Sequence, residues 1–517
     1  MTTIPITSPY SFLRSIVQIQ GNRNYLLLGL GISILSFVLF KLLYPYPDFL
    51  SDSYSYLEAA HLNLGISIWP IGYSKVLWAF HHLTYSDTAF VGFQYLFLQV
   101  SSLYFFFTVR YLYQPSKVTQ KLLFAFLFIN PLSLYLSNTI NSDALFAALS
   151  ILWFSQLLWM IQRPKVYQLF VQAILLFLCF TIRNNAYYYP LIAIFSFLLS
   201  KQPLRWKLAG IIMPFLLIIP FVIHTRNEAF KITGTRQFSL FTGWQLANNA
   251  LYIYDQIEVD SAGLPNAQAK DLNREAIAFF KKVNPAVYRD FLESYVGNFF
   301  IKQPDAPLKQ YCGHHYTKEA SGIAAWGKAS ADFEPFGKYV IMHNPVTYAR
   351  YFMLPNAWHY IMPPLSHLEQ YNYGADTIAV IGKVWFHYPS VRVHVWSHGF
   401  QGFLLVYTAL FLVFNLYYLW YLVAYLRKKG FSWKVQGERS AFQLTALFLL
   451  FNFGFSIFAT VNILRYQYVP MIALLSFSLL MSDYLERLAA EAKGKSKKFT
   501  PNSENSALYR IHKQPIQ

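Results

Sequence analysis

Acidic side chains lie among aromatic ones directly after the first long apolar segment of this chain, where they could transfer protons. The stretch DFLSDSYSYLEAAHLNLGISIWPIGY runs from Asp48 to Tyr73 and holds three acids. A carboxylate within hydrogen-bonding reach of a hydroxyl takes its proton as the hydroxyl attacks an electrophile. We therefore expect Asp52 to act as a general base, and we include Glu58 in the same candidate catalytic set. The alternative is that Asp52 is a solvated loop residue that caps a helix beginning near Tyr54.

Asp143 is a further candidate, because it opens another apolar segment in the sequence NTINSDALFAAL. We expect it to lie beside Asp52 as a catalytic carboxylate that binds the acceptor or a metal ion. Two carboxylates and a substrate phosphate would suit Mg²⁺ or Mn²⁺, although no pattern in the sequence requires a metal. The alternative is structural: an acid in the first helical turn interacts favourably with the helix dipole, with Asn141 or Ser142 as the cap.

Two arginines lie at the ends of later apolar segments, on the side where basic residues are otherwise scarce. Arg183 ends one segment in TIRNNAYYYP, and Arg465 begins another in NILRYQYVP. A guanidinium group matches a phosphate with two parallel hydrogen bonds and can stabilise it as a leaving group. Both are therefore candidates for binding a donor phosphate. The alternative is that they reach towards lipid headgroups.

Histidines occur in two arrangements that resemble metal-ligand spacing. His314 and His315 follow Cys312, and His394 precedes His398 by four residues. Four well-spaced Cys and His residues would indicate zinc. Neither group reaches that number, so we expect ordinary histidines near a membrane interface.

The elements that must position these residues are membrane spans. The chain has 517 residues, of which 55% are hydrophobic and only 13% are charged, a profile typical of polytopic membrane proteins. We predict a mainly α-helical bundle of ten spans, each long enough or nearly so to cross ~30 Å of hydrocarbon. The predicted spans are Tyr25–Leu43, Thr88–Tyr113, Val118–Leu136, Asp143–Ile161, Val166–Ile182, Tyr187–Leu199, Trp206–Ile223, Gly399–Leu426, Ser440–Thr460 and Ile463–Leu485.

The distribution of Lys and Arg predicts the orientation. Alternate loops are basic, as in the segment 427–439 and after Leu485, which places both termini in the cytoplasm. The net charge of +18 is thus mostly a topology signal, and we expect no nucleic-acid partner. The chain contains no Asn-X-Ser/Thr sequon, which favours a bacterial inner membrane.

The spans and loops divide the chain into five parts. We predict a cytoplasmic tail (1–24), a module of seven spans (25–224) with a catalytic first outer loop (44–87), an extracytoplasmic domain (225–398), three final spans (399–485) and a basic, disordered tail (486–517).

The extracytoplasmic domain has sequence patterns of its own. We expect an amphipathic helix over Ala267–Phe300, interrupted at Pro285, and another over Pro345–Phe352. Phe238–Tyr254 and Thr377–Phe386 are candidate strands.

The layout resembles the GT-C superfamily of integral membrane glycosyltransferases, in particular bacterial members related to protein O-mannosyltransferases and aminoarabinose transferases. The resemblance rests on five stretches and on a large outer domain after the seventh span. The stretches are SDSYSYLEAA, WPIGY, NSDALFAALSILWF, TIRNNAYYYP and LRYQYVP. Where some relatives carry paired acids, SDSY and NSDA each have one, which leaves metal dependence open.

The resemblance implies a specific reaction and specific partners. Asp52 matches the position of the catalytic base and Asp143 the second acidic position, while Arg183 and Arg465 would bind the carrier phosphate. The donor would be a sugar on a polyprenyl phosphate, lodged among membrane lipids, and the acceptor a lipid, glycan or protein. Its hydroxyl or amine would attack the anomeric carbon with inversion.

Two other function classes compete with this interpretation. A polymerase or ligase of lipid-linked glycans has similar topology, but it would depend on arginine-rich outer loops more than on carboxylates. A lipid or glycan flippase would line its cavity with polar side chains, whereas ionisable residues are nearly absent from the middle of the predicted spans.

Overall fold

The computed structural model describes residues 11–294, 297–316, 322–430, 437–459 and 461–492. Within these ranges the regular structure is helical, and the only β-type pairings are isolated bridges, Asp48 with Thr139 and Thr377 with Arg392. The chain is therefore mainly α, as its composition predicts.

Both strand predictions are wrong. Phe238–Tyr254 contains helix α12 (Thr242–Leu251), and Thr377–Phe386 contains helix α20 (Val380–Phe386). In α12 the buried residues Trp244, Ala247 and Leu251 recur at helical spacing and cover one face. The short apolar run therefore belongs to a packed helix. Over so few residues, the spacing of apolar residues does not distinguish a strand from a buried helix.

In the described part of the chain, eight helical segments are long and apolar enough to cross a membrane. They are α2 (Gln20–Leu43), α5 (Asp87–Tyr113), α6 with α7 (Lys117–Phe128 and Pro131–Asn138), α8 (Asp143–Gln162), α11 (Leu204–Thr233), η5 with α21 (Phe400–Leu404 and Leu405–Lys429), α22 (Gly437–Ala459) and η6 with α23 (Leu464–Gln467 and Tyr468–Ala492).

The two remaining predicted spans are helical but shorter. They correspond to α9 (Tyr167–Ile182), of 16 residues, and α10 (Tyr189–Leu199), of 11 residues. The helical bundle is thus confirmed, while the total of ten spans stays a prediction. The break between α6 and α7 has a clear cause: Pro131 has no N–H to continue a helix, and the Asn130 side chain accepts a hydrogen bond from the Leu132 N–H instead.

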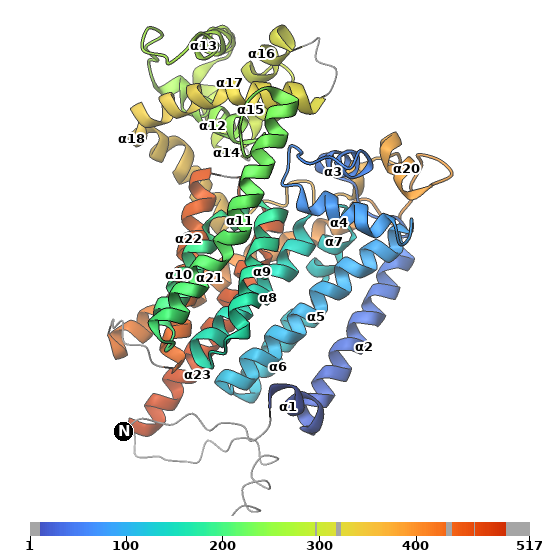
Figure 1. The fold of residues 1–517 in the computed structure, drawn as a ribbon, viewed down its shortest axis with the longest axis vertical. Coiled ribbons are helices and arrows are strands. Elements are labelled where there is room, and N and C mark those ends of the chain that lie inside the picture. The colour runs from blue at the N-terminus through green and yellow to red at the C-terminus, as the bar shows by residue number, and fades with distance from the viewer. Residues whose placement is uncertain (1–10, 295–296, 317–321, 431–436, 460, 493–517) are drawn as a thin grey trace, which may run out of the picture.

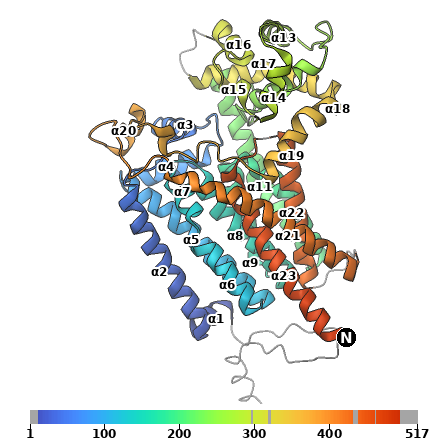
Figure 2. The same cartoon turned by 180° about the vertical axis from the view of Figure 1, so that it is seen from behind.

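One end of the bundle carries a helical cap, shown above the spans in Figure 1 and from behind in Figure 2. We call this the capped end. Helix α11 continues from the bundle into the cap, where a separate hydrophobic core forms around residues such as Trp244, Phe300 and Phe336. The cap comprises α12, η2 (Tyr254–Gln256), α13 (Ala267–Phe280), α14 (Pro285–Ser294), α15 (Phe299–Lys302), α16 (Pro307–His315), α17 (Gly322–His343), α18 (Pro345–Tyr348), the π-helix η3 (Ala349–Met353) and α19 (Leu354–Ile361).

Of the two amphipathic helices predicted for the cap, Pro345–Phe352 is helical throughout, as α18 and η3. The first is confirmed over α13 and α14, with the expected break before Pro285, but α14 ends at Ser294, residues 295–296 lie outside the described chain, and α15 begins only at Phe299. Helices α12 and α17 pack closely because Gly243 lies against the Ser330 backbone. A Cβ atom at Gly243 would lie 1.7 Å from the Ser330 carbonyl oxygen.

The segment after α19 returns to the bundle instead of joining the core of the cap. Tyr371, Trp385 and Val393 belong to the same hydrophobic cluster as the spans. The segment contains η4 (Tyr371–Gly374) and α20, and it lies beside the two short helices that follow α2. These are α3 (Ser51–His61) and α4 (Gly72–His81).

The opposite end of the bundle holds the first helix and the end of the last one. Helix α1 (Phe12–Gln18) lies there, in the part predicted to be a tail. Helix α23 continues to Ala492, so the disordered tail predicted from residue 486 is wrong for its first seven residues. The rest of that tail, 493–517, lies outside the described residues.

Candidate functional site

Four of the predicted residues meet at the capped end, each placed by the end of a helix. Asp143 is the first residue of α8, and Asp52 lies in the first turn of α3. Arg183 follows the last residue of α9 in an extended conformation, and Arg465 lies in the short helix η6 that leads into α23. We call these four residues the ion group.

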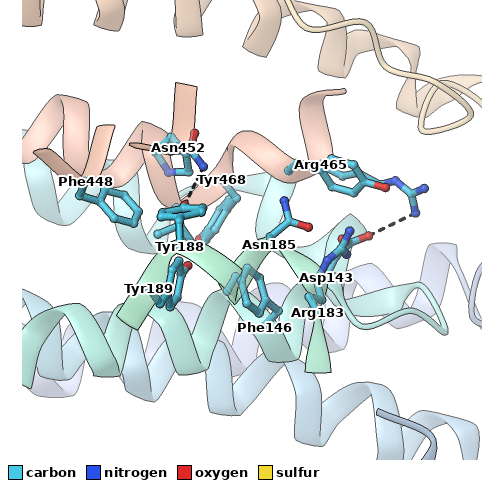
Figure 3. Close-up of a pocket in the computed structure, with 14 residues that line it drawn as sticks. Asp143, Phe146, Arg183, Asn185, Tyr188, Tyr189, Phe448, Asn452, Arg465 and Tyr468 are labelled. Carbon is cyan, nitrogen blue, oxygen red and sulfur yellow. Dashed lines mark hydrogen bonds and ion pairs between the residues drawn. The ribbon is translucent and has the colours of Figure 1, made fainter. Parts of the chain in front are cut away.

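Asp143 is the centre of the ion group. One of its carboxylate oxygens, Oδ1, pairs with Nη1 of Arg183, and the other, Oδ2, lies 3.2 Å from Nη1 of Arg465. The side chains of Asp143, Arg183 and Arg465 are only 4%, 12% and 11% exposed. Figure 3 shows the three side chains directed at one another from different helices. Because both guanidinium groups are buried, the Asp143 charge compensates them directly.

Arg465 also connects Asp143 to Asp52. Its Nη2 lies 3.7 Å from Asp52 Oδ2, while its Nη1 pairs with Asp143. The Nε of Arg465 is buried and has no hydrogen-bond partner, so one donor remains for a bound anion.

Neighbouring residues hold the ion group in place. Ser142 Oγ lies 3.0 Å from the Tyr56 hydroxyl and accepts a 3.4 Å hydrogen bond from Arg183. The Tyr466 ring lies against both guanidinium groups, 4.4 Å from Cζ of Arg183 and 5.3 Å from Cζ of Arg465. These contacts orient the arginines, whose charges Asp143 compensates.

Neither predicted capping role is present. Helix α3 begins at Ser51, and the Ser53 hydroxyl, not Asp52, accepts a hydrogen bond from the backbone N–H of Leu50. Ser142 precedes α8 without a capping hydrogen bond from its side chain. Asp143 does occupy the first helical turn, so the favourable interaction with the helix dipole adds to its ion pairs.

Glu58 does not join the ion group. It lies six residues after Asp52 on α3 and is exposed. Six residues at 100° each turn the side chain to a different face of the helix. The structure therefore separates Glu58 from the other predicted catalytic residues.

A narrow pocket extends from the ion group into the bundle, with aromatic walls (Figure 3). Tyr188, Tyr189 and Phe448 line it, and the Asn452 amide donates a 2.9 Å hydrogen bond to the Tyr188 hydroxyl. The charged rim and apolar interior suit a ligand with an anionic head and an apolar chain.

Asp48 positions the ion group, although it was not among the predicted site residues. Its backbone exchanges hydrogen bonds with the loop before Asp143, from Asp48 N to Asn138 O (2.8 Å) and from Ile140 N to Asp48 O (3.0 Å). Its carboxylate accepts a 2.9 Å bond from the Asn372 N–H. Asp48 thus joins three segments that are distant in the sequence, and it does so four residues before Asp52. The position of Asp48 beside Asp52 was visible in the sequence, but its partners were not.

His367 approaches the ion group from the segment after α19. Partial burial lowers the pKa of His367, nearby Lys302 lowers it further, Glu369 raises it, and Arg465 and Asp52 act in opposite directions. The ring packs 4.6 Å from Tyr373, whose hydroxyl accepts a hydrogen bond from the Ser51 N–H. No pattern in the sequence marked His367.

The histidines with ligand-like spacing lie apart from one another and from the ion group. His394 packs on Tyr46, while Nε2 of His398 lies 2.7 Å from Asp376 in a segment that is not helical. On α16, His314 contacts Glu275 and His315 stacks on Tyr311.

The ion group does not fit the divalent cation that Asp52 and Asp143 could have held. Arg465 lies between the two carboxylates, in the place such an ion would take, and the second oxygen of Asp143 belongs to Arg183. Among the residues that the structure describes, no three His, Cys, Asp or Glu side chains come together as a metal site. The reaction proposed for this site therefore involves no metal ion.

In comparisons with known proteins, no protein-family model, no curated protein and no solved structure matches the chain.

We predict that Asp143→Asn destabilises the protein by about 3 kcal/mol, because it leaves two buried guanidinium groups without their shared carboxylate. Adding Arg183→Gln should restore part of that loss. Thermal unfolding of the detergent-solubilised protein measures both effects. The exposed pair Arg274–Asp271 is the control, and its removal should cost at most about 1 kcal/mol. A double variant no more stable than Asp143→Asn would contradict the coupling.

A second prediction concerns Asp48, whose carboxyl pKa rises from 3.8 to about 6 because the residue is buried; the hydrogen bond from the Asn372 N–H limits the rise. The folded state thus binds this proton more tightly than the unfolded state, which favours folding below about pH 4. This contribution disappears as the pH rises through about 6. Asp48→Asn keeps an oxygen for the Asn372 N–H but does not titrate.

The free energy of unfolding of the wild type, relative to Asp48→Asn, should therefore fall by about 2 kcal/mol between pH 4 and pH 7. Denaturation of both proteins across this range provides the measurement. Asp290→Asn, at an exposed residue of α14, controls for general charge effects. A constant difference between wild type and Asp48→Asn would refute a titration of Asp48.

Proposed function

We propose that this protein is a membrane glycosyltransferase of the GT-C type, which moves a sugar from a polyprenyl phosphate to an acceptor hydroxyl or amine with inversion. The main supporting observation is the ion group: a partly exposed carboxylate, Asp52, lies next to the buried Arg465, which Asp143 links to Arg183 beside an aromatic pocket. In this proposal the capped end faces away from the cytoplasm, as the distribution of basic residues predicts.

Asp52 is the base in the proposed reaction. It is the most exposed member of the ion group, with 25% of its side chain accessible, so an acceptor can reach it. As the acceptor oxygen or nitrogen forms its bond to the anomeric carbon, its proton passes to Asp52. The bond from the anomeric carbon to the phosphate oxygen breaks, and its electron pair leaves with the polyprenyl phosphate.

Arg183 and Arg465 stabilise the phosphate as it gains charge. A phosphodiester carries one negative charge, and the released monoester approaches two. Arg465 contacts Asp52, and Asp52 loses its negative charge when it takes the proton. The unpartnered Nε of Arg465 can donate a hydrogen bond to the phosphate, which gains a negative charge at the same time. The Arg465 guanidinium thus interacts both with the base and with the leaving phosphate, and Asp143 keeps it in place.

The pocket beside the ion group suits the first part of the lipid carrier. Its walls are mainly apolar, with Phe146, Tyr189 and Phe448 among the lining residues. An isoprenoid chain bound there would hold its phosphate at the level of the two arginines.

We predict that Asp52→Asn lowers the rate of sugar transfer by about 10²–10⁴-fold, as loss of a general base does. Donor binding should stay close to that of the wild type, since both arginines and Asp143 remain. Membranes incubated with radiolabelled polyprenyl-phosphate sugars, followed by isolation of the labelled product, measure the rate. Asp290→Asn, an equivalent change at an exposed residue of the cap, is the control. Transfer at the wild-type rate by Asp52→Asn would reject the assignment of the base.

Replacing both Arg183 and Arg465 by Gln should weaken donor binding at least about tenfold, because two charge-assisted hydrogen bonds to phosphate are lost. The KM for the acceptor should change much less. Binding of a labelled polyprenyl-phosphate sugar in detergent separates the two quantities. Arg274→Gln, on the exposed surface of α13, is the control. An unchanged donor affinity in the double variant would reject the phosphate role.

A further inference from the structure

A second pocket lies on the other side of the short helix η1 (Asn184–Tyr188), which directly follows Arg183. Asn184 and Tyr187 line this second pocket, whereas Asn185 and Tyr188 line the pocket beside the ion group. The remaining walls come from the segment 66–71 between α3 and α4, from Phe221 and Thr225 of α11, and from residues 238–239.

Two buried hydroxyl groups in this second pocket have no hydrogen-bond partner. Ser67 is 3% exposed and Thr225 is 5% exposed, and neither hydroxyl oxygen is bonded. Ser67 lies in the loop between α3 and α4, and Thr225 lies in α11, where Thr233 by contrast donates to the Ala229 carbonyl at 2.8 Å. Burying a hydroxyl without a partner is unfavourable, so each of these two requires a water molecule or a polar group of a ligand beside it.

Aromatic rings continue from the second pocket towards the cap. Trp69 lines the pocket, and its ring lies 4.8 Å from that of Phe241. Phe241 is in turn nearly parallel to Trp326, at 8° and 6.4 Å. All three rings are half-buried, so each keeps some accessible surface. We call them the aromatic row; it ends at Lys309, whose ammonium lies 4.8 Å from the Trp326 ring.

The residues that line the second pocket exclude two kinds of ligand, ionic groups and purely apolar chains. None of them is Asp, Glu, Lys, Arg or His, so an ionic group would lose its hydration without gaining a charged partner. A purely apolar chain would leave Ser67 and Thr225 unsatisfied. A neutral sugar ring meets both demands, because its hydroxyls can donate and accept while its C–H faces pack on aromatic rings.

We propose that the second pocket and the aromatic row form an acceptor subsite that binds a neutral sugar, so that the acceptor of this enzyme is a carbohydrate. The role as acceptor site rests on the proposed function, whereas the binding of a neutral sugar does not. Donor phosphate and acceptor sugar then lie on opposite sides of η1, with Arg183 at its start. The walls come from segments that no sequence pattern connects: a loop after α3, η1 and the outer part of α11.

The test uses the full-length protein in lipid nanodiscs and saturation-transfer NMR, which detects weak binding. The probes are methyl α-D-glucopyranoside, methyl β-D-glucopyranoside, methyl α-D-mannopyranoside and methyl β-D-galactopyranoside. We expect millimolar binding of at least one glycoside, weakened about tenfold or more by Ser67→Ala with Thr225→Val, since two hydrogen bonds are lost. Thr225→Val keeps the shape of the side chain, and Thr233→Val, which removes a hydroxyl already bonded within the same helix, should change nothing.

Several outcomes would overturn the proposal. The proposal fails if none of the four glycosides binds, or if the double variant binds them as the wild type does. It also fails if glucuronate binds more tightly than the neutral glycosides, or if octanol shows a stronger saturation-transfer signal than any sugar. Asp52→Asn separates this result from the proposed function, because it should bind the glycoside as the wild type does while losing transfer. Glycoside binding by a protein that transfers no sugar from any polyprenyl-phosphate donor would disprove the enzyme and leave the sugar site standing.

Discussion

The rest of this structure depends on one buried carboxylate held between two guanidinium groups. Asp143 begins α8, and its partners Arg183 and Arg465 come from the end of α9 and the beginning of the last span. A lone charge at this depth would be strongly unfavourable, so the helix ends that carry the three groups must stay together. The pairing therefore acts on the fold and on the chemistry at once: the constraint that joins these helices also presents two positive charges to one place.

The loops at the capped end extend this constraint to Asp52. The short pairing of Asp48 with the segment before Asp143 fixes where α3 begins, and Asn372 closes the same junction from a segment more than 300 residues later. Because Asp52 lies in the first turn of α3, its distance to Arg465 follows from that junction. A general base on an untethered loop would lack this precision.

Helix η1 divides the two pockets by their chemistry. Towards the last spans the lining residues combine two arginines with apolar rings, which suits an anionic lipid. Towards α11 the lining residues are aromatic and neutral, with hydroxyls in need of partners, which suits a sugar. The proposed transferase would use such a division, because its two substrates differ in character and would meet at one bond without competing for one site.

The sequence was sufficient for what depends on local composition. The apolar segments, their helical state and the location of Asp52, Asp143, Arg183 and Arg465 at helix ends follow from short-range patterns, since burial in lipid leaves the backbone few alternatives. The folded chain decided the rest, because contacts between remote residues have no local signature. It brought four charges together, set Arg465 between the carboxylates where a metal was considered, turned Glu58 to another face of α3, and converted two supposed strands into helices packed against distant partners.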